Sequence, residues 1–179
     1  MANLHWREWH QARRAAIMFG SLKTLISSLA ADARRPDQLE TQSCRLATAS
    51  LLIRVATIDG EMSEARLAKL HAILKSGFAL DDVATARLID AAATAERGAI
   101  DLYHFTRQLN DALDDEGRRR VIRMMWEVVF VDRTANEFAN NVVWRTADLL
   151  GVPSRQRIAL RQQIAADSTV LAGHAPTGR

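Results

Sequence analysis

The chain has 179 residues, which is the length of one domain with a short extension. Apolar residues make up 48% of it and charged residues 25%, so a chain that is disordered over most of its length is excluded. The formal net charge is only +3, and a balance this mild does not by itself indicate a nucleic-acid-binding protein. The 30 alanines and 20 leucines far outnumber the 8 glycines and 3 prolines, which predicts an all-α fold.

Residues 1–36 are predicted to form an N-terminal amphipathic helical arm and a linker. Trp6 and Trp9 lie among basic residues, which leaves two interpretations open: a short extra helix, or a contact with an anionic membrane through residues 1–30. No apolar run reaches the roughly 20 residues that span a bilayer. Lys23 interrupts the one segment that resembles an export signal, which disfavours a signal peptide.

The helical core is predicted between residues 37 and 167, and residues 168–179 are predicted to be a flexible tail. Apolar residues recur at helical spacing through the core. The predicted helices cover residues 38–58, 64–76, 81–95, 101–113, 115–131, 136–150 and 154–167. Counting the arm, about seven to eight helices with short loops predict a compact bundle.

Local signals mark the ends and the buried faces of these helices. Gly60 suits the left-handed position past a helix end, and Ser63 suits an N-cap. In the helix at 81–95, the apolar residues Val83, Leu88 and Ile89 are expected to be buried.

A weak internal repeat occurs at an offset of 73 residues. Val55, Asp59 and Glu64 recur as the identical residue types at positions 128, 132 and 137. Each copy consists of an apolar helix, an aspartate, a short gap and a second helix opened by a glutamate. The repeat therefore predicts two pseudo-symmetric helix–acidic loop–helix halves.

The acidic loops carry candidate ligands for a cation. Asp59, Glu61 and Glu64 lie within six residues, so their carboxylates can converge, and the second loop offers Asp132 and Glu137. Hard oxygen ligands suit calcium or magnesium, although the EF-hand pattern is absent. The alternative is that these acids only stabilise helix N-termini, where exposed N–H groups and the helix dipole favour them.

With these residues in view, the chain resembles the TerB-like family, which includes tellurite-resistance TerB proteins and is similar to the helical domain of the membrane-associated co-chaperone DjlA. The resemblance runs from about Leu46 to Ile164. It is carried by residues 51–56 leading into 59–64, by 124–132 leading into Glu137, and by 147–152.

The resemblance implies an all-α bundle of two related halves without catalytic activity. It implies that the acidic loops bind divalent cations. The sequence departs from the family pattern at Arg133 and Thr134, which weakens the case for a cation site in the second loop. It also implies a scaffold or sensor role in stress-response assemblies, in the cytoplasm or peripherally at the inner membrane. The alternative is a metal-independent module that contacts a protein or a membrane surface in a co-chaperone-like manner.

A basic run is the remaining candidate site. It consists of Arg118, Arg119, Arg120 and Arg123, which Arg155, Arg157 and Arg161 would extend if their helices adjoin. Consecutive helical residues fan over about 200°, and acids at 114–116 lie just upstream, so a solvated face is favoured and nucleic acid is disfavoured. Two further interpretations stay open: a patch that binds phosphate or an acidic partner, and a homo-oligomer.

Enzyme chemistry finds no support in the pattern. The five histidines include no pair at the helical spacing of metal ligands, and His71 is interpreted as a partly buried structural residue. Cys44 has no histidine beside it in sequence and is interpreted as a buried, unreactive thiol. As the single cysteine it excludes an internal disulfide and favours a reducing cytosol.

Overall fold

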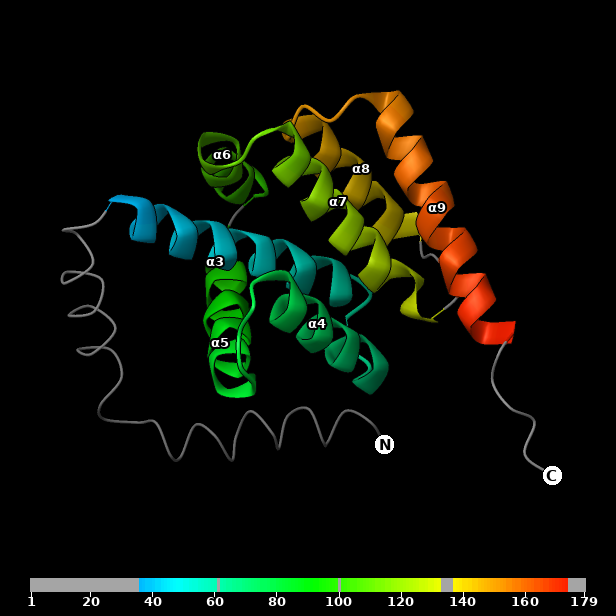
Figure 1. Ribbon diagram of the computed structural model, residues 1–179, viewed down its shortest axis with the longest axis horizontal. Helices are drawn as coiled ribbons and strands as arrows, with labels where there is room; N and C mark the ends of the chain where they lie inside the picture. Colours follow the sequence, from blue (N-terminus) through cyan, green and yellow to red (C-terminus); the bar gives the residue numbers. More distant parts are fainter. Residues whose placement is uncertain (1–35, 61, 100, 133–136, 174–179) are drawn as a thin grey trace.

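The computed structural model describes residues 36–60, 62–99, 101–132 and 137–173. Within these ranges the chain forms seven α-helices, one short 3-10 helix and no strand (Figure 1). The helices are α3 (Pro36–Ala56), α4 (Glu64–Gly77), α5 (Asp82–Gly98), α6 (Tyr103–Ala112), α7 (Asp115–Val129), η1 (Phe130–Asp132), α8 (Glu137–Leu149) and α9 (Ser154–Gly173). The all-α prediction is confirmed. The pseudo-symmetry of the two halves stays a prediction.

Side-chain caps begin three of the helices where the sequence placed their starts. Ser63 accepts a hydrogen bond from the Arg66 amide at 3.1 Å, Asp81 one from the Ala84 amide at 2.7 Å, and Asp114 one from the Gly117 amide at 2.8 Å. Each cap satisfies an N–H group that has no partner within its own helix. Such local chemistry explains why these starts are readable from the sequence.

Some boundaries differ from the prediction. α3 begins at Pro36, because proline is tolerated in the first helical turn, where its missing N–H needs no partner. α9 continues past 167 to Gly173. The arm at 1–35 and the last six residues lie outside the described residues, so the membrane contact predicted for 1–30 stays a prediction. None of the described helices is long and apolar enough to cross a membrane.

Helix α3 is the centre of the bundle. It contacts each of α4, α5, α6, α7 and α8, and α9 packs against α7 and η1 at one edge (Figure 1). Because α3 is enclosed on several sides, its second half is buried almost residue by residue, including Leu51, Leu52, Val55 and Ala56. It therefore shows no strong polar face, unlike a surface helix.

Val83 corrects one expected core position. Its exposed fraction is 60%, whereas Ile89 is buried and Leu88 is partly buried against the core. The buried face of α5 runs through Thr85, Ile89, Ala92 and Ala93. Val83 lies two positions before Thr85, which turns it about 200° around the helix, away from this face.

An aromatic cluster joins α7, η1, α8 and α9. Trp126 is fully buried, its ring stacks on Phe130 with centroids 5.7 Å apart, and it meets Trp144 edge to face at 6.2 Å. The Arg161 guanidinium of α9 lies 5.6 Å from the centroid of the Trp126 ring. Aromatic and cation–π contacts of this geometry add to the burial of area, so the cluster holds α9 against the bundle.

Candidate cation and arginine sites

The first acidic loop is the turn between α3 and α4, and it holds an internal ion pair. The Arg66 guanidinium donates a hydrogen bond to Asp59 Oδ1 at 2.7 Å and another to the Ala56 carbonyl at 3.0 Å. The side chain of Arg66 is 9% exposed and that of Asp59 31% exposed. Ala56 ends α3, so Arg66 links the C-terminal end of one helix to the first turn of the next. Gly60 has φ +95°, which makes the sharp turn between them.

This geometry gives the predicted cation ligands separate surroundings. Asp59 faces a guanidinium, Glu64 is exposed in the first turn of α4, and Glu61 lies outside the described residues. Within the described ranges no group of three or more His, Cys, Asp or Glu side chains is placed to hold a metal ion. A positive charge 2.7 Å from Asp59 competes with any cation at that carboxylate. Calcium or magnesium binding stays a prediction.

The second acidic loop lies between η1 and α8. Asp132 is the last residue of η1, and its side chain lies outside the description, as do residues 133–136. Glu137 is exposed at the first position of α8, where the helix dipole favours a carboxylate. These two acids therefore stay predicted ligands.

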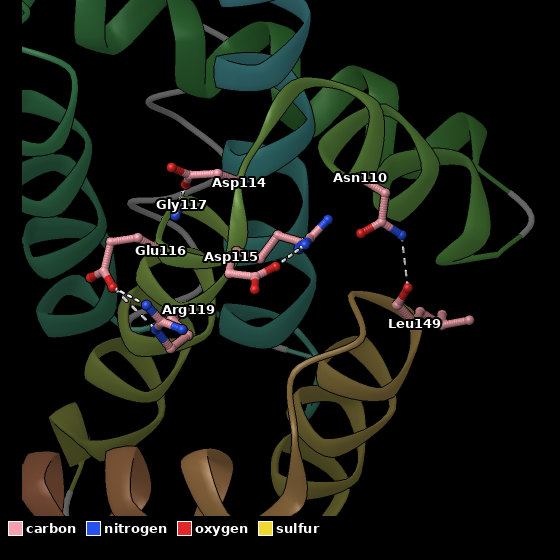
Figure 2. A network of polar contacts seen from close by, with 8 residues as sticks. Asn110, Asp114, Asp115, Glu116, Gly117, Arg119 and Leu149 are labelled. Atoms are coloured by element: carbon pink, nitrogen blue, oxygen red, sulfur yellow. Dashed lines mark hydrogen bonds and ion pairs between the residues drawn. The ribbon is translucent and has the colours of Figure 1, made fainter.

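The arginine run of α7 is partly paired within its own helix, as the sequence predicted. Arg118 pairs with Asp115, and Arg119 pairs with Glu116 through Nε at 3.1 Å and through Nη2. Figure 2 shows the acids and their partners at the start of α7, together with the bond from the Asn110 amide to the Leu149 carbonyl that ties α6 to α8. Glu116 raises the pKa of Arg119 through its hydrogen bond, so this charge is permanent.

Arg119, Arg120 and Arg123 line a groove on α7, which we call the arginine groove. It consists of two hollows of about 420 and 370 Å³ that share Arg123 and Glu127. α7 contributes to both hollows, and η1 contributes to the second one only. Residues of α4 and of α9 line each hollow as well, and both helices contact α7. The remaining lining residues are Lys69, Ile73, Ser76, Gly77, Glu116, Met124, Phe130, Val131, Leu160, Ile164, Asp167 and Ser168.

A family model described as tellurite resistance protein TerB matches residues 45–162. The chain belongs to the TerB family. The match begins within α3 and ends within α9, so it includes the Asp59 turn, the arginine run and most of the groove lining. A search of curated proteins and a search of solved structures each found no match.

In this TerB-family chain the arginines of α9 do not extend the groove, although α9 does adjoin α7. Arg157 pairs with Asp148, donates to the Val152 carbonyl and lies over the Trp144 ring. Arg161 lies over the aromatic cluster, and neither side chain is among the groove lining. Both charges therefore serve the packing of α9, which the sequence spacing alone did not distinguish from a surface patch.

Arg66 and Gly77 are the site residues that the sequence reasoning missed. Arg66 shares one buried stripe with Leu70, Ile73 and Leu74, at the spacing i, i+4, i+7 and i+8, so its inward position was readable. Gly77 comes directly after the helix predicted at 64–76, and the sequence assigns it no further role. A Cβ atom there would lie 2.7 Å from Met124 Cε, the end of a flexible side chain, so a larger residue at this position would require Met124 to shift.

The predicted structural roles of His71 and Cys44 agree with their surroundings. His71 is partly buried, with Nε2 3.7 Å from Asp82 Oδ1, which also accepts a 2.8 Å hydrogen bond from Lys75 Nζ. Cys44 is buried, and burial raises the pKa of its thiol, which disfavours the reactive thiolate.

Asp82 should titrate below the ordinary range of an aspartate. The hydrogen bond and charge of Lys75 lower its pKa, and the charge of His71 adds to this. Because the folded pKa is depressed, the stabilising link between α4 and α5 is present at neutral pH and is lost as the pH falls through that pKa. An NMR titration of the Asp82 carboxyl should show the low midpoint, and Lys75→Met should move it upward. An unchanged midpoint in Lys75→Met would contradict the assigned cause.

Proposed function

We propose that this TerB-family chain is a non-enzymatic interaction domain in a tellurite-resistance-type stress response, and that it binds its partner in the arginine groove. The observation that carries the proposal is the position of three arginines from one helix along an open groove. The opposite face of α7 is buried through Val121, Met125 and Val128, so the bundle holds these arginines in place. Rigid presentation lowers the entropy that binding costs.

The composition of the groove supports a binding role. Arginine is enriched at protein interfaces because its planar guanidinium forms several hydrogen bonds while its stem packs on apolar atoms. Here Arg120 and Arg123 stand beside the apolar side chains of Ile73, Met124 and Leu160. Two of the lining arginines have carboxylate partners on α7, which keeps their side chains ordered before a partner arrives.

The cellular role is tested by deletion of the gene in its own host. We expect the deletion to lower survival on potassium tellurite, and a plasmid copy of the wild-type gene to restore it. A copy with Arg119→Gln, Arg120→Gln and Arg123→Gln should fail to restore survival, whereas the matched control Arg107→Gln, an exposed arginine on α6, should succeed. Full survival of the deletion strain would contradict the stress role.

A cation-biased form of the same scaffold is the second candidate. The turn at Asp59 places Glu64 at the start of α4, and a cation bridging these acids would fix the angle between α3 and α4. The Arg66 link already joins the same two helix ends. A calcium titration distinguishes the cation bridge from the Arg66 link.

A further inference from the structure

We propose that the occupant of the arginine groove is an acidic amphipathic helix of a partner protein. This rests on the proposed function, because it names the partner chemistry of the same site. Three properties of the groove support the proposal: its length, the order of its charges and the apolar side chains among its lining.

The length of the groove suits a helix. Its lining on α7 and η1 runs from Glu116 to Val131, which spans about 24 Å at the 1.5 Å rise of an α-helix. The walls come from α4 and α9, each of which contacts both α7 and η1. A helix of about four turns would fill this length, whereas a single small anion would occupy only a fraction of it.

The charges have an order along the groove. Acidic Glu116 and Glu127 flank the basic centre formed by Arg119, Arg120 and Arg123. The second hollow adds one charge of each sign, Lys69 and Asp167, beyond this centre. Glu116 pairs with Arg119, and Glu127 lies 3.6 Å from Arg123 and 3.1 Å from Lys69 of α4. The Arg120 guanidinium instead donates to the Gly77 carbonyl at 2.7 Å and, within the described part of the chain, forms no ion pair. A partner with carboxylates opposite this centre matches the pattern, and such complementarity sets register.

Apolar side chains stand between the charged ones in the lining of both hollows. Ile73, Met124 and Leu160 line the first, and Phe130 and Ile164 line the second. Leu160 and Phe130 are the partly exposed members of this set. Apolar anchors at helical spacing on a partner would bury against these two residues, which is the helix-in-groove mode of recognition. Nucleic acid would leave these apolar contacts unused, so the acidic helix is the better match.

The test uses a defined probe and the full-length chain. The probe is a fluorescein-labelled helical peptide of about 16 residues, with leucines along one face and glutamates beside them. The comparison peptide has glutamine at every glutamate position. We expect fluorescence anisotropy to show tighter binding of the glutamate peptide, and binding that weakens as salt rises. Arg119→Gln, Arg120→Gln and Arg123→Gln together should weaken it by about tenfold or more, and Arg107→Gln should leave it unchanged.

A charge reversal keeps the proposal falsifiable if the neutral variant loses structure. The combined variant Arg119→Glu, Arg120→Glu and Arg123→Glu should lose the glutamate peptide and gain a lysine peptide with the same leucines. It should also keep the helical circular-dichroism signal of the wild type, which shows that a folded groove makes the exchange. Equal binding of the glutamate and glutamine peptides by the wild type would overturn the proposal. Tighter, arginine-dependent binding of duplex DNA or of phosphatidylserine vesicles than of the peptide would also overturn it.

The tellurite-survival experiment and the peptide-binding experiment test different parts of the proposal. If tellurite survival depends on the three arginines while the glutamate peptide does not bind, the acidic helix is rejected and the interaction role stands. If the peptide binds through the arginines while the deletion strain survives fully, the partner chemistry stands and the stress role is rejected.

Discussion

Replacing Trp126 by alanine should lower the free energy of unfolding by about 3–5 kcal/mol, the range found when a large buried aromatic is truncated. Trp126 is fully buried, and it contacts Phe130, Trp144 and the Arg161 guanidinium. Its loss would leave a cavity where α7, α8 and α9 meet. Because α9 contacts α7 and η1 on this side, we expect α9 to separate from the bundle at lower denaturant concentration than the rest.

Urea unfolding followed by circular dichroism measures the loss, and hydrogen exchange locates it. Trp126→Phe should cost much less than Trp126→Ala, because the ring contacts persist and the indole N–H forms no hydrogen bond within the described part of the chain. Tyr103→Ala is the exposed control, since Tyr103 is 59% exposed, and it should change the free energy by about 0.5 kcal/mol or less. Similar losses for Trp126→Ala and Tyr103→Ala would contradict the role of the cluster.

Arg66→Met should lower the free energy of unfolding by about 2–3 kcal/mol, because it leaves the Ala56 carbonyl and the Asp59 carboxylate without the guanidinium that both contact. Methionine retains an apolar stem of similar length, so the change isolates the polar link. The effect should fall on the angle between α3 and α4, which this link joins.

A double-mutant cycle separates the link from other effects of each change. Asp59→Asn combined with Arg66→Met should cost less than the sum of the two single variants, since each single change already removes the ion pair. Arg107→Met, at an exposed position of α6, is the matched control and should stay within about 0.5 kcal/mol of the wild type. Strict additivity would show that Arg66 and Asp59 do not stabilise the turn together.

Calcium distinguishes the Arg66 link from a cation link at the same turn. If a cation bridges Asp59 and Glu64, excess calcium raises the melting temperature, and Asp59→Asn with Glu64→Gln abolishes the rise. We expect instead that the wild-type melting temperature stays constant, because Arg66 already neutralises Asp59 at 2.7 Å. A calcium-dependent rise would favour the cation-biased scaffold.

Local signals account for what was predictable along the chain. Three helices are capped by the side chains of Ser63, Asp81 and Asp114. Each side chain accepts a hydrogen bond from the backbone amide three residues later. Gly60 and Gly151 have positive φ values of 95° and 67°, as their places past helix ends require. The pairing of the α7 arginines with the acids upstream also follows from i, i+3 spacing. All these interactions lie within about one helical turn, so neighbouring residues decide them.

By itself, the sequence determined the helical class, the TerB family and most helix ends, because propensity, capping and periodicity are properties of short segments. Only the tertiary structure decided which charges are used inside the fold. It turned Val83 outward, brought Arg66 against Asp59 and Ala56, and took Arg157 and Arg161 into aromatic packing. It also assembled the arginine groove from α4, α7 and α9, whose contacts join residues more than 40 positions apart and depend on how the helices pack.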